Sequence, residues 1–419
     1  MQTSTQQVTT VAELLAATQN PQVARIQLAA SLSNVPSVRL LPGQTLSAAD
    51  AQTAIRFASG EDGLQLSADN QVEHLSLITD PERRAIFNDT TVAHLGRLTL
   101  RRLSITGVLK LLARDQVCGG HVEAHDIDIV SADARGYQER PKGYGVEVIP
   151  GVFTLWNQQA DPAVTLTADL TGLSAGRDGA PVRGSSIFVS GAGDTGGRLI
   201  ARRLETGAVY SDGGIAPGTP DRISGGVFTV YGAFVGNVRN LGPITTYGAN
   251  DMVLDNWGTV DCWVAEDKIT SHGPSGIGFV NFGTVNVLQV NDVIETFGQG
   301  ARGFNVYTGT VQTAEFERVV THADGAVGIQ ISQPVGRITV RRGIETWGGT
   351  GDSLVKGVVI TLSAIALSIK PGGSIRELEV AGGLRAHGKG VDALEMHGHI
   401  ETLRIDGSLA ATGGGFDAI

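Results

Sequence analysis

The chain has 419 residues and a formal charge of −10, and 18% of its residues are charged. Hydrophobic residues make up 41% of it, which excludes intrinsic disorder because a disordered chain lacks the apolar residues to build a core. No run of Lys or Arg exceeds a doublet such as Arg101-Arg102, so no basic stripe is available to replace counterions and we expect no nucleic-acid partner.

The sequence leaves the cellular location open. Met1 to Val8 has neither a basic start nor an apolar core, so we expect no signal peptide, and an extracellular or surface location fits a mature or trimmed form. The longest apolar stretch, Val358 to Ile369, is far shorter than the roughly 20 residues of a membrane span, and we expect no membrane insertion. Cys118 and Cys262 are expected to be small buried hydrophobes and not a disulfide.

The N-terminal segment, residues 1–42, is predicted to be a cap. Thr10 and Glu13 have the spacing of a capping box and precede the apolar run Leu14 to Ala17. This pattern predicts one short amphipathic helix, which would cover strand edges that an open first coil exposes.

Residues 43–232 are predicted to form irregular coils with long insertions. Short strand-like pieces such as Val146–Val148 and Ile187–Val189 recur at uneven spacing in this region. The insertions between them are rich in Gly, Pro, Asp and Arg, and we expect loops at 133–145, 157–186 and 212–225.

Residues 233–419 carry a regular repeat that decides the fold. Each unit opens with a glycine, then a short alternating strand, a second apolar position and a glycine-rich corner; the opening glycines are Gly258, Gly283, Gly309, Gly336, Gly373 and Gly398. Strands this short cannot bury an apolar face alone, whereas stacked coils pair their backbones and share one core. The pattern predicts an all-β fold: one single-stranded, right-handed parallel β-helix over residues 1–419, with about 25 residues per coil.

The last coil is predicted to be uncapped. The segment that begins at Phe416 aligns with Val391 to Leu394 of the preceding coil, and no cap sequence follows it. Because an uncovered coil end exposes unpaired strand edges, we expect another subunit or another segment to cover this end, or the end to fray; another subunit would make a homo-oligomer through the C-terminal coil.

The N-terminal cap and the stacked glycine-opened coils resemble the right-handed β-helices of the pectate lyase-like superfamily, and the final third also resembles bacterial surface passenger and adhesin repeats. The resemblance implies a carbohydrate-related function, with calcium-binding aspartates and a basic catalytic residue in the lyases. No segment here matches those motifs closely enough to transfer a residue. His397-Gly-His399 inverts the Gly-His-Gly of the related polygalacturonases, and no Asp-Asp pair occurs.

An acidic column is the first candidate site. When the coils are stacked in register, Asp267, Asp292 and Glu317 with Arg318 fall at equivalent positions, and Glu345 follows. Acids about 5 Å apart raise one another's pKa, which is how a general acid arises, or they hold a calcium ion. The alternative is that Asp and Asn occupy corners because turns favour them. No other cofactor and no transition-metal site is predicted, because the histidines His272, His322 and His387 do not all lie on consecutive coils.

The first insertion is the second candidate site. It mixes the cations Arg135, Arg140 and Lys142 with Tyr137 and Tyr144, and these side chains, with Trp156 nearby, are the predicted substrate-binding residues for an acidic sugar. The alternative is a solvated loop.

Two functions remain open. The first is a β-helical scaffold without its own chemistry, which presents loops to a polysaccharide or cell-surface glycan. The second is a carbohydrate-active enzyme, a lyase or hydrolase of an acidic polysaccharide. The enzyme predicts a groove that joins the acidic column to the cations of the insertion, and the scaffold predicts that the two stay apart.

Overall fold

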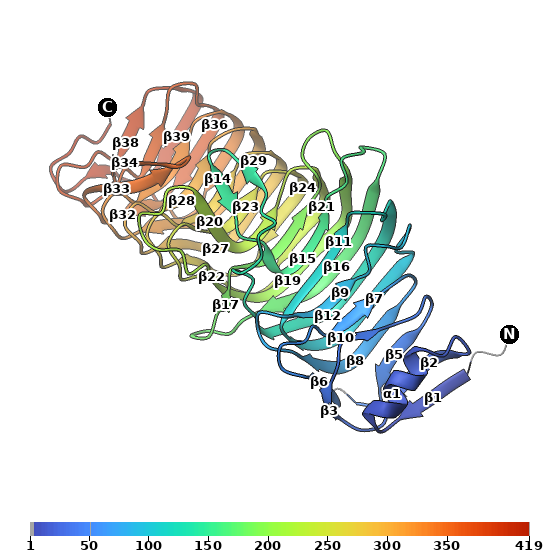
Figure 1. Ribbon diagram of the computed structural model, residues 1–419. Helices are drawn as coiled ribbons and strands as arrows, with labels where there is room; N and C mark the ends of the chain where they lie inside the picture. Colours follow the sequence, from blue (N-terminus) through green and yellow to red (C-terminus); the bar gives the residue numbers. More distant parts are fainter. Residues whose placement is uncertain (1–3, 51, 419) are drawn as a thin grey trace.

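Parallel strands of successive coils stack into two long sheets that run the length of a rod, with the two ends of the chain at opposite ends of the rod (Figure 1). The structure is a computed structural model and describes residues 4–50 and 52–418. Strands make up 59% of the chain and helix 2%. The predicted all-β parallel β-helix is confirmed.

The first sheet contains 23 described strands. They are β1 (Ser4–Val8), β2 (Val23–Leu28), β3 (Leu32–Val35), β5 (Thr45–Ala48), β6 (Ala54–Phe57), β8 (Gln71–Ile78), β10 (Arg97–Thr106), β12 (Gly119–Ser131), β16 (Thr165–Ala175), β17 (Val182–Arg183), β19 (Arg198–Asp212), β21 (Ala233–Asn240), β22 (Ile244–Thr246), β24 (Thr259–Ala265), β25 (Ile269–Ser271), β27 (Thr284–Thr296), β29 (Thr310–Thr321), β31 (Pro334–Val340), β32 (Ile344–Thr346), β36 (Ser374–Ala381), β37 (Leu384–Ala386), β39 (His399–Asp406) and β40 (Leu409–Ala411).

The second sheet contains 15 described strands, and a separate two-stranded sheet is formed by β33 (Thr350–Val355) and β34 (Val358–Ser363). The strands of the second sheet are β4 (Val38–Arg39), β7 (Leu64–Leu66), β9 (Arg84–Asn88), β11 (Val108–Ala113), β13 (Lys142–Gly143), β14 (Val146–Val148), β15 (Gly151–Asn157), β18 (Ser185–Ser190), β20 (Arg222–Thr229), β23 (Asp251–Asn256), β26 (Ile277–Asn281), β28 (Arg302–Val306), β30 (Val327–Ile331), β35 (Leu367–Ile369) and β38 (Leu394–Met396).

The first sheet bends around a corner and so supplies two sides of each coil. The early part of β27 pairs with β24 and its last residues pair with β25, which are separate strands one coil earlier. The second sheet supplies the third side, through pairs such as β26 with β28. Equivalent residues of neighbouring coils are parallel partners, as Ile269 is with Ile294. Side chains therefore meet by column, one coil apart.

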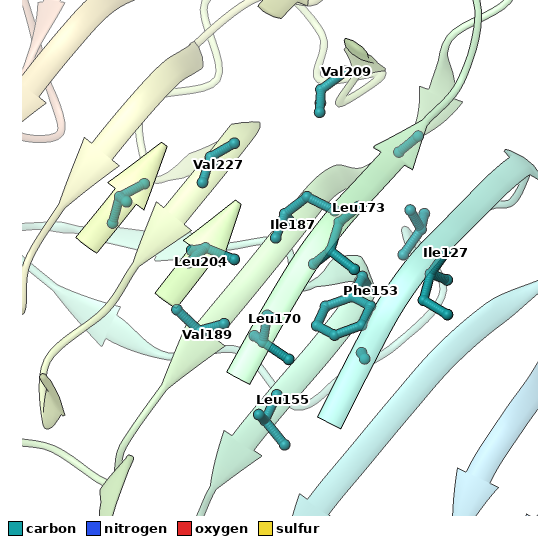
Figure 2. Close-up of a cluster of buried hydrophobic side chains, with 14 of the residues drawn as sticks. Ile127, Phe153, Leu155, Leu170, Leu173, Ile187, Val189, Leu204, Val209 and Val227 are labelled. Carbon is teal, nitrogen blue, oxygen red and sulfur yellow. The ribbon is translucent and has the colours of Figure 1, made fainter. Parts of the chain in front are cut away.

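Inward-facing Leu, Ile, Val and Phe side chains form one continuous core that extends from Val8 to Leu394. Figure 2 shows part of it, where Phe153 and Leu155 of β15 face Leu170 and Leu173 of β16. Burying a side chain of this size contributes roughly 1.5–3 kcal/mol to the free energy of unfolding, relative to leaving it exposed. A long thin core can therefore stabilise the rod.

The N-terminal cap forms as predicted. The helix α1 (Val11–Thr18) begins with a capping box in which Thr10 Oγ1 accepts from the Glu13 amide at 3.2 Å, and Glu13 accepts from the Thr10 amide at 3.1 Å. Leu14 and Ala17 of the helix lie in the core. A strand that the sequence did not indicate, β1, precedes the helix and pairs with β2.

Three expectations are corrected. The stretch 157–186 is not one loop, because Thr165–Ala175 is a full strand of the first sheet that pairs with β12 and β19. Val146–Val148 lies outside the coils, in an antiparallel hairpin with β13 whose second strand pairs with the start of β20. Cys118 is exposed and Cys262 is half-buried.

Two hairpins cover the outer face of the second sheet. The β13–β14 hairpin and the β33–β34 hairpin together bury a second apolar cluster that contains Trp156, Phe228, Val280 and Tyr307. The tips meet although they are far apart in the chain: a Cβ on Gly145 would lie 2.6 Å from the Lys356 carbonyl oxygen. Glycine is needed at such an approach. We call the side chains between this sheet face and the hairpins the outer layer.

Candidate functional site

The residues of the predicted acidic column lie at the corner between the two sides of the first sheet. Asp292, Glu317 and Arg318 line one cleft of about 450 Å³, together with Glu295, Glu345, His322, Arg342 and Trp347. Asp267 lies one coil earlier, since Ile269 pairs with Ile294, and it does not line this cleft. We call this cleft the acidic corner.

Cations pair with the two half-buried carboxylates of the acidic corner. Glu295 contacts Lys268 at 2.5 Å and His322 at 2.9 Å, and Glu345 contacts Arg318 at 2.5 Å and His387 at 3.0 Å. Burial acts to raise the pKa of both carboxyls, but the hydrogen bonds from these partners outweigh it and hold each pKa below its usual value. Both groups are therefore ionised, and neither stores a proton for general acid catalysis at neutral pH.

A column of stacked rings runs along the same corner. Tyr247, His272, Phe297 and His322 stack face to face on consecutive coils, with centroids 5.2, 5.1 and 4.6 Å apart. Trp347 stacks on His387 at 4.0 Å and is 51% exposed. We call these six residues the ring column.

The sequence contained a signal for the ring column that we did not use. Its first five members stand 25 positions apart, the step of the coil, and aromatic residues alternate with histidines. The histidines were singled out without their aromatic neighbours. In the structure, the rings on the intervening coils separate them.

The first and third insertions enclose a larger cleft of about 590 Å³, which we call the insertion cleft. Its lining includes Arg135 and Arg140 from the first insertion and Arg222 at the end of the third; the other charged residues are Glu82 and Asp133. Arg135 is paired with both oxygens of Asp133, at 2.9 and 2.6 Å. The third insertion, with Asp212, Asp221 and Arg222, was a weaker candidate from the sequence, and the structure brings Arg222 to the same cleft as Arg135 and Arg140.

Arg140 and Arg222 leave positive charge uncompensated in this cleft. Arg140 donates to the carbonyls of Tyr137 and Arg135 at 3.2 and 2.9 Å, and its one carboxylate contact, with Glu147, is 3.9 Å long. Burial and then the charge of Arg222 lower the pKa of Arg140. Among the described residues, Arg222 has no ion-pair or hydrogen-bond partner for its side chain, and its Nε is buried.

The other predicted binding residues are placed apart from this cleft. Tyr137 is half-buried beneath Lys110, whose Nζ lies 4.3 Å from the ring centroid, and burial raises its pKa to about 12. Lys142 is exposed and pairs with Glu147. Tyr144 stacks on Phe282 at 4.3 Å, with 38% of it exposed. Trp156 is buried and donates to the Gly191 carbonyl at 3.0 Å, so its ring faces are not open to a ligand.

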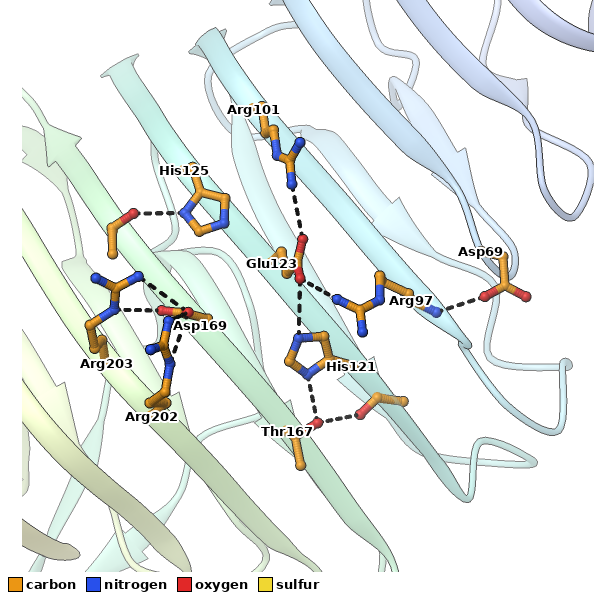
Figure 3. A network of polar contacts seen from close by, with 12 residues as sticks. Asp69, Arg97, Arg101, His121, Glu123, His125, Thr167, Asp169, Arg202 and Arg203 are labelled. Atoms are coloured by element: carbon orange, nitrogen blue, oxygen red, sulfur yellow. Dashed lines mark hydrogen bonds and ion pairs between the residues drawn. The ribbon is translucent and has the colours of Figure 1, made fainter.

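A third polar cluster lies on the outer face of the earlier coils (Figure 3). Glu123 pairs with Arg97 and Arg101, and Asp169 pairs with Arg202 and Arg203 across the coils. Burial acts to raise the pKa of Asp169, but hydrogen bonds from the two arginines hold it below the usual value. Each drawn carboxylate of these pairs has its own cations. Such solvated pairs stabilise the surface slightly and leave no free group for a ligand.

The acidic corner and the insertion cleft share no lining residue. They are nevertheless related by the corner of the rod, because Ser211 pairs with Thr246, which places Asp212 and Tyr247 at equivalent positions. Asp212 directly precedes Gly213 and Gly214, which line the insertion cleft. The ring column therefore leads from the insertion cleft to the acidic corner.

Within residues 4–50 and 52–418, no group of three His, Cys, Asp or Glu side chains is arranged to hold a metal ion. No helix of this part is long and apolar enough to cross a membrane. Comparisons with protein-family models, with curated proteins and with solved structures found no significant match. The fold therefore rests on the geometry of the strands alone.

Proposed function

We propose that this chain is a β-helical scaffold that binds an acidic glycan in the insertion cleft, without chemistry of its own. The observation that carries the proposal is the proximity of Arg140 and Arg222 inside a cleft of about 590 Å³, where the carboxylate contact of Arg140 is 3.9 Å long. Guanidinium groups favour carboxylates because their planar donors match two oxygens at once. A uronic acid supplies such a carboxylate.

The shape of the surface supports an elongated ligand. The ring column starts at the coil beside the insertion cleft and presents Phe297 and Trp347, which are 39% and 51% exposed, along the rod. Exposed aromatic rings beside polar groups suit the mixed apolar and hydroxylated surface of a sugar. A chain of several uronic acid residues could therefore contact the cleft with one unit and the rings with others.

The state of the carboxylates supports binding without catalysis. Glu295 and Glu345 are ionised and paired with cations, and the cleft that they line is separate from the arginines of the insertions. A hydrolase requires one protonated carboxyl next to the sugar bond. The superfamily resemblance is compatible with either role and does not choose between them.

Isothermal titration with oligogalacturonate and oligomannuronate, with cellohexaose as the neutral control, tests the proposal. We expect an acidic oligosaccharide to bind and to weaken with rising salt. Arg222→Gln should weaken binding about 10-fold or more, since a hydrogen bond to a charged group contributes roughly 1.5–3 kcal/mol. Arg376→Gln, at an exposed position on β36, is the matched control and should bind as the parent does.

Two outcomes would contradict the proposal. Equal affinity of the parent and Arg222→Gln for every acidic ligand would remove the cleft as the binding site. Shortening of the oligosaccharide by the parent chain, abolished in Glu317→Gln, would show chemistry at the acidic corner and replace the scaffold with the enzyme.

A further inference from the structure

The outer layer contains a cluster of buried polar groups without partners, separate from both clefts described above. It lies where the β33–β34 hairpin crosses β28 of the second sheet. Ser353 Oγ donates to the Gly300 carbonyl at 2.6 Å, and the Leu354 amide donates to Ser275 Oγ at 3.0 Å. These two hydrogen bonds join the hairpin to the coils.

Arg302 is the central group of this cluster. Its side chain is completely buried, and its one hydrogen bond is from Nη1 to the Leu354 carbonyl at 3.4 Å. Nε and Nη2 are buried without a hydrogen-bond partner, and no carboxylate among the described residues pairs with it. Nε and Nη2 form one edge of the guanidinium, with two parallel donors, and this edge is the free one.

Two further donors lie near Arg302. Tyr307 is 5% exposed, and its ring centroid is 5.9 Å from Arg302 Cζ. Asn305 is fully buried on the same strand as Arg302, and its side chain contacts the Tyr307 hydroxyl. Among the described residues, neither side chain has a well-aligned hydrogen bond to any other group. Lys356 lies above the layer, with Nζ 5.3 Å from the Tyr307 centroid.

A buried guanidinium in this setting requires a counterion. Arginine keeps its proton at all relevant pH values, so it cannot become neutral as a buried lysine can. The free energy needed to bury an isolated charge is far larger than the free energy gained from one hydrogen bond. Asp255 does not supply the countercharge, because it lies two coils away in the column Asp255–Val280–Asn305, roughly 10 Å along the stack.

We propose that Arg302, Asn305 and Tyr307 form a buried binding site for a small oxyanion, a carboxylate or phosphate group held by the Nε–Nη2 edge of Arg302. The Asn305 amide and the Tyr307 hydroxyl donate to its remaining oxygens. Because Arg302 also holds the Leu354 carbonyl, the bound anion fastens the β33–β34 hairpin to the coils. The burial of all three side chains favours a small free anion over a group on a polymer, and the site does not depend on glycan binding elsewhere.

Crystals grown with selenate allow a direct test, because anomalous scattering from selenium locates the anion without ambiguity. We expect a peak within hydrogen-bond distance of Arg302 Nε and Nη2. In solution, thermal unfolding in inorganic phosphate, sulfate or acetate, at ionic strength fixed with chloride, should give a melting temperature that rises and saturates with anion concentration. The anion that raises the melting temperature at the lowest concentration indicates whether the natural ligand carries a phosphate or a carboxylate group.

Three variants separate a site from a general salt effect. Tyr307→Phe removes one donor and should require about 5-fold more anion for half of the stabilisation. Asn305→Asp supplies an internal carboxylate beside Arg302, so it should be stable without added anion and should no longer respond to it. Arg302→Met should lose the response, and the Asn305→Asp result decides the question if Arg302→Met does not fold.

The proposal is overturned if selenate gives no peak at Arg302 and only water occupies the space. It is also overturned if the peak appears but neither phosphate, sulfate nor acetate stabilises the parent more than Asn305→Asp, because the ion would then be adventitious. Loss of glycan binding in Arg222→Gln leaves this site intact, so failure of the proposed function and failure of this site are distinguishable.

Discussion

Asp251 and Asp255 lie on the same strand, β23, and are both fully buried, but they differ in their hydrogen bonds. Asp251 accepts from Ser224 Oγ and from the amides of Gly213 and Gly248, at 3.2 and 2.8 Å for the two amides. Among the described residues, neither oxygen of Asp255 has a well-aligned hydrogen bond, and its contact with the Trp257 indole offsets the effect of burial on its pKa only in part. The Asp251 carboxyl therefore holds the third insertion in place. The Asp255 carboxyl lies in the outer layer, where its burial is not offset by strong hydrogen bonds.

Replacing Asp255 with valine should stabilise the protein at neutral pH. Its column neighbours are Phe228 and Val280, so valine continues an apolar column and removes an unpaired buried group, for a gain of about 1–3 kcal/mol in the free energy of unfolding. Urea denaturation at pH 7 measures this. Asp251→Val is the matched control and should lose about 2 kcal/mol or more, since three donors lose their acceptor.

The gain from Asp255→Val should depend on pH. Burial raises the pKa of Asp255 well above its usual value, so the folded chain holds a proton that the unfolded chain releases above about pH 4. The parent therefore loses stability as the pH rises from 4 to 7, and the variant loses less. Burial also raises the pKa of Asp251 to about 7, and that contribution remains in both proteins. An equal slope in parent and variant would contradict the assignment.

The Asn281 side chain should stabilise the corner at which the strands of the second sheet end. Its Nδ2 donates to the Gly283 carbonyl at 2.9 Å, and its Oδ1 accepts from Asn256 Nδ2 of the preceding coil at 2.8 Å. Asn281→Ala should lower the free energy of unfolding by about 1–3 kcal/mol, because it leaves buried groups unpaired. Asn291→Ala is the control: Asn291 donates to Glu266 at 2.7 Å at an exposed position, and its loss should be within about 0.5 kcal/mol.

The columns could be predicted because a solenoid converts a step in sequence into a neighbour in space. The register that pairs Ile269 with Ile294 and Ile294 with Val319 is the coil step already visible in the opening glycines. Asp292 and Glu317 were therefore expected at one corner, and they line one cleft. The same reasoning gives the capping helix, whose signal at Thr10 and Glu13 is local.

The outer layer could not be predicted, because its contacts follow no period. Gly145 and Lys356 meet only because two insertions fold back over the same sheet face. The strand Thr165–Ala175 was assigned to a loop for a related reason: the turn-forming residues around it outweighed its own alternation. The composition of the first and third insertions marked Arg140 and Arg222 separately, but it did not predict that the two side chains line one cleft.

Trp347 should contribute to ligand binding more than to stability, because half of its surface is exposed. If an acidic oligosaccharide extends along the ring column, Trp347→Ala should weaken binding of a hexamer about 2- to 10-fold, the equivalent of roughly 0.5–1.5 kcal/mol for an aromatic contact. Binding of a dimer confined to the insertion cleft should not change. Phe416→Ala, at a position 71% exposed near the end of the rod, is the control and should affect neither ligand.

Removing the Glu295 carboxylate should destabilise the acidic corner only above acidic pH. Burial acts to raise the pKa of Glu295, but Lys268 and His322 outweigh it and hold the pKa below its usual value. A carboxyl with a lowered folded pKa adds stability above its unfolded pKa, near 4.3, and loses it as the pH falls through the folded value. Glu295→Gln should therefore cost up to about 1 kcal/mol at pH 7 and almost nothing at pH 3, by urea denaturation at both pH values. Glu379→Gln is the control. Glu379 is more exposed and lies 3.8 Å from Arg404, so we expect no change in the free energy of unfolding at either pH. A loss of stability in Glu295→Gln that persists at pH 3 would show that the effect comes from packing and not from charge.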